Sequence, residues 1–222
     1  MTASDVLAIG PPRFVELHQA DSLARTRAEL FLEAEYARAF GGLIRHHYPL
    51  LMTAVGHDGA VLAAVGFRPA TKEPFFLEQY LDEPVEAAIA RRLDEPVRRA
   101  DVVEIGNLAS ASPCASRFLF SALADHLEQL GATHAVATAT RQLRRSFRRI
   151  CFPVSPLGAA EAARLTQAGA DWGSYYSRDP QVVVGRIACA LPALRAGVLA
   201  AEVLAARLAE RAQAFAHSQA AP

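Results

Sequence analysis

The alternation of apolar and polar positions is most regular in the middle of the chain, where strand-like and helix-like stretches follow one another. Residues 101–109 (DVVEIGNLA) are rich in β-branched residues and predict a strand. Ser112-Pro113 is a good N-cap and first-turn pair, and leucines at helical spacing follow it. Residues 133–140 predict a second strand, and residues 141–149 predict a second helix. This β-α-β-α order with short connections is typical of neighbouring strands crossed over by a helix.

The N-terminal part predicts an extended lead-in, one helix and a β-hairpin. Apolar residues recur at helical spacing over residues 23–37, and Asp21 or Ser22 can cap that helix. Two apolar runs, residues 50–55 and 60–67, flank an Asp-Gly pair, which is a hairpin turn signal.

The C-terminal part is less regular. Residues 157–168 predict an alanine-rich helix, residues 171–176 an aromatic loop, and residues 181–187 a last strand. A long Ala/Leu helix is expected from Leu191, as an element of the core or of a dimer. Its apolar seam has a period near 3.5 residues and contains Leu194, Val198, Ala201, Ala205, Leu208, Ala212 and Phe215.

Composition and charge exclude several classes of protein. The 222 residues contain 23 Lys+Arg and 23 Asp+Glu, and this balance argues against nucleic-acid binding by bulk charge. With 52% hydrophobic and 21% charged residues, the chain can build a full core. Three widely spaced cysteines without a C-x-x-C argue against a disulfide framework or a zinc knuckle, and no metal site is expected. No signal peptide or spanning helix is recognisable, so the expected location is the reducing cytoplasm.

The turn after residues 101–109 is a candidate site for a phosphate or a pantetheine arm. A helix N-terminus offers free backbone N–H groups and the positive end of a dipole, and the residues here are small. The alternative is an ordinary capped helix. The candidate donor-binding residues are Leu108, Ala109, Ser110, Ser112, Cys114, Ala115, Ser116 and Arg117.

Glu104 and Asn107 are the polar candidates within this strand. A carboxylate among apolar neighbours is costly unless it is paired or used in function. Glu104 is therefore a candidate base or an anchor for an amine, or else it is paired with one of the many arginines. By strand alternation Glu104 and Gly106 share one face, and Asn107 lies on the other.

An acidic and aromatic set is the candidate acceptor site. Glu78, Tyr80 and Asp82 alternate within EQYLD and could line a pocket for an amine if that segment is extended. The alternative is a solvated edge strand in which Asp82 caps a helix that carries Val85 and Ile89. The aromatic loop adds Trp172, Tyr175 and Tyr176.

Five arginines lie within residues 141–149, opposite an apolar face. They form either a solvated helix face or a docking surface for an acidic carrier protein, a cofactor phosphate or anionic lipid. The residues that would dock a carrier protein are Arg141, Arg144, Arg145 and Arg148.

Several runs, in order, resemble one known bacterial family. They are FFLEQYLDEPVEAAI, VVEIGNLAS, TATRQLRRSFRRI and WGSYYSRDPQVVVG, and the resemblance covers most of residues 15–187. The chain is similar to the thermostable-hemolysin family, which is grouped with GNAT-type acyltransferases and is distantly similar to acyl-homoserine-lactone synthases.

The resemblance implies an α/β fold of the GNAT-like N-acyltransferase kind, with a central twisted mixed sheet flanked by helices. It divides the chain into an acyltransferase domain (residues 1–188) and a C-terminal helical arm (residues 189–222). In such folds an acyl-thioester lies where two central strands splay apart, and its pyrophosphate binds at the helix that follows the fourth strand.

The resemblance also implies a reaction. An acyl group would move from acyl-CoA or acyl carrier protein to an amine-bearing small molecule, with Glu104 as base and Asn107 orienting the acyl carbonyl. One departure from the GNAT pattern is Phe147, which stands where these enzymes often have a tyrosine that protonates the leaving thiolate. A second departure is a phosphate loop without the usual glycines. Two alternatives stay open: a membrane-active haemolysin, and a non-catalytic acyl-CoA sensor.

Overall fold

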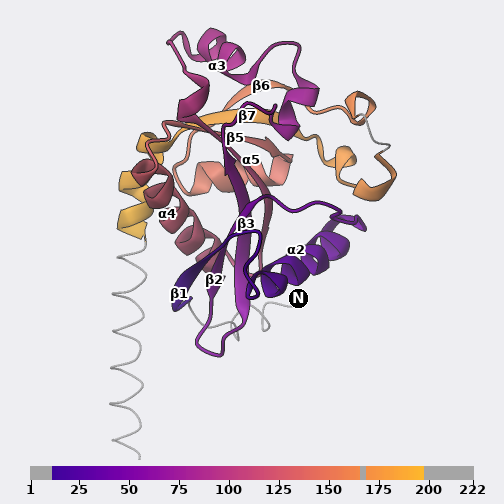
Figure 1. Ribbon diagram of the computed structural model, residues 1–222, viewed down its shortest axis with the longest axis vertical. Helices are drawn as coiled ribbons and strands as arrows, with labels where there is room; N and C mark the ends of the chain where they lie inside the picture. Colours follow the sequence, from indigo (N-terminus) through magenta and orange to yellow (C-terminus); the bar gives the residue numbers. More distant parts are fainter. Residues whose placement is uncertain (1–11, 166–168, 198–222) are drawn as a thin grey trace, which may run out of the picture.

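A computed structural model describes residues 12–165 and 169–197 of the chain. Its centre is a seven-stranded mixed sheet in the order β1-β2-β3-β4-β5-β7-β6 (Figure 1). Of the described strands, β4 and β5 form a parallel pair and all other neighbours are antiparallel. The strands are β1 (Phe14–His18), β2 (Leu50–Val55), β3 (Val61–Pro69), β4 (Val102–Ser110), β5 (His134–Ala139), β6 (Ser155–Ala159) and β7 (Gln181–Arg186).

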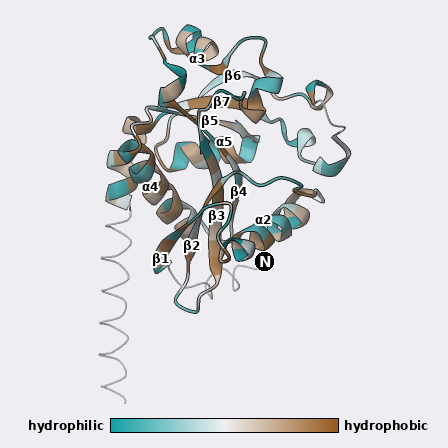
Figure 2. Cartoon of the chain, viewed as in Figure 1, coloured by the Kyte–Doolittle hydropathy of each residue, from teal (hydrophilic) through white to brown (hydrophobic). Residues whose placement is uncertain are grey.

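Helices cover both faces of this sheet (Figure 1). The α-helices are α2 (Arg25–Phe40), α3 (Val85–Leu93), α4 (Pro113–Gln129) and α5 (Arg141–Arg149). Short 3₁₀ turns are η1 (Phe76–Tyr80), η2 (Arg99–Asp101), η3 (Ala162–Arg164), η4 (Gly169–Trp172) and η5 (Tyr176–Arg178). The central strands are predominantly hydrophobic and α5 is predominantly hydrophilic (Figure 2), as expected for a buried sheet beneath surface helices.

The predicted β-α-β-α unit is present as β4-α4-β5-α5, and its local signals explain it. Ser112 caps α4 by accepting a hydrogen bond from the Ala115 N–H at 3.2 Å, and Pro113 occupies the first turn. Thr140 caps α5 in the same way, with the Leu143 N–H as donor. The predicted hairpin is also confirmed, because β2 and β3 pair antiparallel across Gly59 at φ 81°.

Strand alternation divides the core between the two faces. Val103 and Ile105 of β4 pack with Leu119 of α4 and Phe147 of α5 on one face. On the opposite face, α2 packs against β2 and β3 through Ala28, Leu32, Leu51 and Ala64. We call these the α4/α5 face and the α2 face.

Several predicted details are wrong. Residues 76–80 are not extended but form η1, so Glu78, Tyr80 and Asp82 do not alternate along a strand. Pro84 rather than Asp82 is the N-cap of α3, and Ala24 rather than Asp21 or Ser22 is that of α2. The predicted helix over residues 157–168 is instead the end of β6 followed by η3, in the described part of that range.

The C-terminal helix begins at residue 187 and is described to residue 197. This part belongs to the core, because Ile187, Leu191 and Leu194 are buried with the α4/α5 face. Arg195 also pairs with Asp125 and Glu128 of α4. The remaining predicted seam positions, and the homodimer expected from them, lie outside the described residues. Within the described residues no helix is long and apolar enough to cross a membrane.

Candidate functional site

The strands β4 and β5 separate halfway along the sheet. Their pairing runs from Val102–His134 to Ile105–Ala137 and stops there, although β4 continues to Ser110. Beyond that point β5 pairs with β7 and β4 pairs with β3. A bulge in β4 accompanies the split, since two residues oppose one residue of β3 and Asn107 takes a φ of 45°. The split leaves an opening within the sheet.

A cavity of about 760 Å³ occupies this split, which is within the size range of small-molecule sites. Its walls come from both faces. Tyr36 and Phe40 of α2 line it on one face, and Phe120 of α4 and Phe147 of α5 line it on the other. The strand residues between them are Ile105, Gly106, Ala137 and Thr138. The cavity therefore runs through the sheet rather than lying on one side of it.

The predicted donor residues divide into two groups. Leu108, Ala109, Ser110 and Ser116 line the cavity. The other four do not: Ser112 caps α4, Ala115 is fully buried, Cys114 is exposed, and the exposed Arg117 lies against Gly197 of the C-terminal helix. The strand end and one turn of α4 thus contribute to the cavity, while Arg117 points elsewhere.

Helix α5 carries several arginines at or beside the cavity, and two of them are compensated by an acidic residue. Arg141 and Arg144 of α5 both pair with Asp179, at 3.5 and 2.7 Å. Arg144 also donates to the Ala139 carbonyl at 2.8 Å, so it is a structural residue. Arg145 lines the cavity and Arg148 does not; both are exposed, and neither has an ion pair within the described part of the chain.

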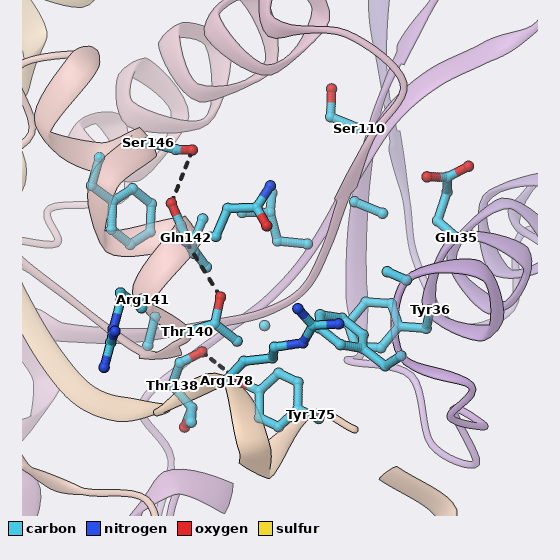
Figure 3. Close-up of a pocket in the computed structure, with 18 of the residues that line it drawn as sticks. Glu35, Tyr36, Ser110, Thr138, Thr140, Arg141, Gln142, Ser146, Tyr175 and Arg178 are labelled. Atoms are coloured by element: carbon cyan, nitrogen blue, oxygen red, sulfur yellow. Dashed lines mark hydrogen bonds between the residues drawn. The ribbon is translucent and has the colours of Figure 1, made fainter. Parts of the chain in front are cut away.

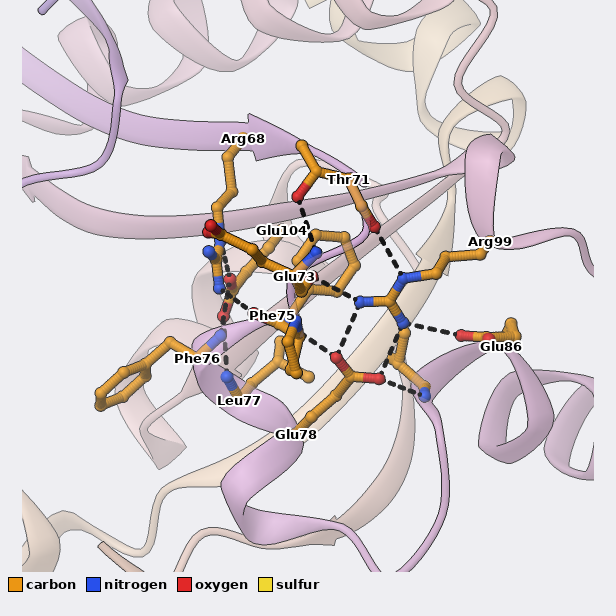
Figure 4. A network of polar contacts seen from close by, with 12 residues as sticks. Arg68, Thr71, Glu73, Phe75, Phe76, Leu77, Glu78, Glu86, Arg99 and Glu104 are labelled. Carbon is orange, nitrogen blue, oxygen red and sulfur yellow. Dashed lines mark hydrogen bonds and ion pairs between the residues drawn. The ribbon is translucent and has the colours of Figure 1, made fainter. Parts of the chain in front are cut away.

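The carboxylate of Glu104 is buried and fully engaged. It accepts hydrogen bonds from Arg68 Nε at 2.7 Å, from the Phe76 N–H at 3.1 Å and from the Leu77 N–H at 2.9 Å (Figure 4). With 1% of the residue exposed, it does not line the cavity. The side chain ties η1 to the sheet, and this is the arginine pairing that the sequence left open.

Tyr48 lies against Glu104 and against Gly106, which lines the cavity. A Cβ atom on Gly106 would come within 2.4–2.6 Å of the Tyr48 ring and hydroxyl, so glycine is what lets the ring cross β4 there. The Asn107 side chain fixes this arrangement by accepting the Tyr48 N–H at 3.1 Å. Burial raises the pKa of Tyr48 well above its ordinary value, and the negative charge of Glu104 raises it further.

Glu78 is also a structural carboxylate. It pairs with Arg99 at 2.9 Å and accepts hydrogen bonds from the backbone N–H groups of Phe75 and Val85, at 2.5 and 2.9 Å (Figure 4). Asp82, in contrast, is exposed and pairs with Arg164 beside a second, smaller cavity of about 250 Å³. Glu78 and Asp82, both predicted to bind the acceptor, therefore do not share a pocket.

Glu78 makes the stability of the fold sensitive to acid. Burial, the largest influence, raises its pKa, but hydrogen bonds from Arg99, Val85 and Phe75 outweigh burial and hold the pKa below the ordinary 4.5. A depressed folded-state pKa contributes stability that is present above 4.5 and lost as the pH falls through the lowered value. We expect Glu78→Gln to flatten the loss of unfolding free energy below about pH 4.5, measured by urea unfolding across that range. Identical slopes for the variant and the parent would refute this role.

The remaining predicted acceptor residues form one aromatic cluster. Tyr80 and Tyr176 share a hydrogen bond between their hydroxyls at 2.7 Å, and Trp172 contacts both Tyr175 and Tyr176. All six predicted acceptor residues are described, and Tyr175 is the one among them that lines the large cavity. Its hydroxyl donates to the Thr138 carbonyl at 3.1 Å, and burial raises its pKa.

The aromatic loop reaches the cavity because the end of α2 holds it. The Ser174 N–H donates to the Phe40 carbonyl at 2.8 Å, and the Leu43 N–H donates to the Asp171 carbonyl at 2.6 Å. Gly173 allows this approach, since a Cβ there would meet the Phe40 carbonyl oxygen at 2.1 Å. As a result, the Phe40 and Tyr175 rings pack edge to face at 5.2 Å.

Several cavity residues could not be predicted from the sequence, among them Glu35 and Tyr36 of α2 and Arg178 of η5 (Figure 3). Tyr36 projects into the cavity, and burial raises its pKa to about 12 while a hydrogen bond with the Leu108 backbone opposes that rise. Tyr36 lies in the helix predicted over residues 23–37 and Arg178 lies between the aromatic loop and the last predicted strand, and neither segment signals a cavity by itself. Among the described residues, no group of three or more His, Cys, Asp or Glu could hold a metal ion.

Comparison with known proteins gives the fold and a family match. A family model described as thermostable hemolysin matches residues 18–191. A search of curated proteins found no match. Solved structures share the fold. LasI, an AHL synthase, is 15% identical with a TM-score of 0.56, covering 83% of this chain and 95% of its own.

Two further solved structures share the fold. BjaI, a CoA-dependent acyl-homoserine lactone synthase solved with SAM and isopentyl-CoA, is 15% identical with a TM-score of 0.56, covering 85% of this chain and 90% of its own. FeeM, an N-acyl amino acid synthase from uncultured soil microbes, is 10% identical with a TM-score of 0.53, covering 83% of this chain and 98% of its own. These likenesses confirm the predicted GNAT-like α/β fold.

Proposed function

The chain belongs to the thermostable hemolysin family, and we propose that it is an acyltransferase that moves an acyl group from a thioester donor to an amine. The observation that carries the proposal is the cavity through the split between β4 and β5, with walls on both faces of the sheet. Two substrates can meet in such a cavity from opposite sides. The fold is that of the acyl-homoserine lactone synthases LasI and BjaI and of the N-acyl amino acid synthase FeeM, and this supports the proposal.

The donor is acyl-CoA or acyl carrier protein, entering from the α4/α5 face. Ser110 and Ser116 leave room for a narrow pantetheine arm at the N-terminal turns of α4, and Arg145 adds a positive charge at that mouth. The thioester carbonyl would then reach the bulged part of β4. Backbone N–H groups there are the proposed donors to the oxyanion, because Asn107 does not line the cavity and its Oδ1 accepts the Tyr48 N–H.

The acceptor enters from the α2 face, where Tyr36, Phe40 and Tyr175 form an aromatic wall. Its nitrogen attacks the thioester carbonyl carbon, the C–S bond breaks, and the leaving thiolate takes a proton to become a free thiol. Phe147 lines this cavity and has no hydroxyl to give that proton. The role of Glu104 as base stays a prediction; we propose that it acts as a positioning residue that holds η1 and Tyr48.

Carrier-protein docking is proposed at the exposed end of α5. Arg144 is committed to Asp179, whereas Arg148 and Arg149 are exposed, do not line the cavity and have no ion pair among the described residues. Reversing their charge, Arg148→Glu with Arg149→Glu, should raise the KM for an acyl carrier protein at least about tenfold at low salt. The KM for the matching acyl-CoA should stay within about twofold. If the parent and the double variant have equal KM values for the carrier protein, the carrier does not dock at this end of α5.

The compartment proposed is the cytoplasm. Cys114, Cys151 and Cys189 are all exposed and unpaired, which fits a reducing environment.

One preparation of protein is enough to test acyl transfer against the two alternative functions, an acyl-CoA sensor and a membrane-active haemolysin. Acyl-CoA and acyl carrier protein of several chain lengths are mixed with a panel of amines, and free thiol and N-acyl product are measured. Product formation supports the proposal. A thermal shift with acyl-CoA but no product with any amine would instead support a sensor, and dye leakage from liposomes that does not depend on a donor would support a haemolysin.

A further inference from the structure

On the α2 face, the cavity is lined by an arginine that forms no ion pair with another described residue of the protein. Arg178 ends η5, is exposed, and has no ion pair or side-chain hydrogen bond among the described residues. The neighbouring charges are already paired: Arg38 with Glu35, and Arg141 with Asp179. An uncompensated guanidinium in a binding cavity is suited to an anionic group of a ligand.

The position of Arg178 places that anionic group on the acceptor. In Figure 3 its side chain lies between Tyr175 and Tyr36 and extends toward Tyr36, on the α2 side of the split. The other uncompensated cavity arginine, Arg145, belongs to α5 on the donor side. Each mouth of the cavity thus has its own free arginine, and the one at Tyr36 is separated from the donor's phosphates by the sheet.

A carboxylate for the amine lies on the same side. Glu35 precedes Tyr36 on α2 and lines the cavity, and in the described part of the chain it pairs with the exposed Arg38. An ionised carboxylate has about four lone-pair sites, so Glu35 can keep Arg38 and still accept an ammonium group. Glu104, by contrast, has three donors and no contact with the cavity.

We propose that the acceptor carries a carboxylate as well as an amine, and so is an amino acid or an analogue of one. The inference rests on the acyl-transfer function proposed above. Arg178 binds the carboxylate through its planar fork, which matches two oxygens at once. Glu35 receives the ammonium and takes one of its protons. The neutral nitrogen then forms the bond to the acyl carbon, the C–S bond breaks, and the second nitrogen proton goes to the thiolate.

The test compares acceptors that differ only in the carboxylate. The standard amino acids are screened first, and the best acceptor is then compared with the amine that lacks its carboxylate, in the parent protein and in Arg178→Met. We expect the parent to prefer the amino acid by about 10- to 100-fold in kcat/KM, and Arg178→Met to bring the ratio close to one. Only the kinetics of the amino acid should change, while the KM for the donor should not.

Two control variants complete the test. One separates the charge of Arg178 from the planar geometry of its guanidinium, and the other separates effects on acceptor binding from effects on donor binding. Arg178→Lys keeps the charge without the fork and should recover part of the preference. Arg145→Met should raise the KM for acyl-CoA and leave the acceptor ratio intact. Equal rates for amino acid and amine in the parent, or a preference unchanged in Arg178→Met, would overturn this inference alone. Absence of transfer to every acceptor would overturn the proposed function with it.

Discussion

Replacing Glu104 with alanine should lower the free energy of unfolding by about 3 kcal/mol. The substitution leaves the N–H of Phe76 and the buried N–H of Leu77 without their acceptor, and leaves Arg68 without its partner. Removing one partner of a buried ion pair typically costs about 3–5 kcal/mol, and the lower end applies because a quarter of the Arg68 side chain is exposed. Urea unfolding at neutral pH measures the loss.

Two matched variants sharpen this result. Glu104→Gln keeps an acceptor for the backbone N–H groups and should lose less than alanine does. Glu83→Gln, which breaks the exposed Glu83–Arg91 pair, should stay within about 0.5 kcal/mol of the parent. A loss below about 1 kcal/mol for Glu104→Ala would contradict the role of this carboxylate as an anchor. If Glu104→Gln folds and releases thiol as fast as the parent, Glu104 is not the base.

Filling the split between the strands should abolish turnover. Thr138 lines the cavity on β5, and Thr138→Trp places a large ring there while keeping a residue type that strands tolerate. We expect kcat/KM for acyl transfer to fall by at least about 100-fold, because the donor and acceptor can no longer meet in line. The melting temperature shows that the variant is folded.

The matched control adds the same ring to the other cavity. Asp82 is exposed beside the small cavity, where Asp82→Trp breaks only its surface pair with Arg164. Turnover of Asp82→Trp should stay within about twofold of the parent. If folded Thr138→Trp keeps the parent's activity, the split does not hold the reacting groups.

The central β-α-β-α unit could be predicted because its signals are local. The β-branched run of β4, the Ser112-Pro113 cap and the leucine spacing of α4 each act within a few residues. The family resemblance added the splay between β4 and β5, and the strand pairing confirms that they separate.

The structure of residues 76–80 could not be predicted, because distant residues determine it. Glu104 binds two backbone N–H groups of η1 from 27 and 28 positions away, and Arg99 holds Glu78 from 21 positions away. These contacts turn an apparent extended segment into a 3₁₀ turn. A pattern of alternating polar residues has no information about either contact.

The acceptor side of the cavity was missed for a similar reason. Tyr36 comes from the first helix and Arg178 from a late loop, and only tertiary structure brings them together. Arg117 shows the converse: its position at the start of α4 suggests a phosphate ligand, and the structure places its side chain against Gly197. Sequence spacing placed the helix correctly and left open which side of it each residue faces.

We propose that a donor thioester and an acceptor amine react in the cavity through the sheet. The most direct measurement is the ratio of free thiol to N-acyl product, followed in one reaction mixture for the parent, Thr138→Trp and Asp82→Trp. We expect one thiol for each amide in the parent and in Asp82→Trp, and neither species above background in Thr138→Trp. Thiol without amide, or equal amide from Thr138→Trp and the parent, would contradict it.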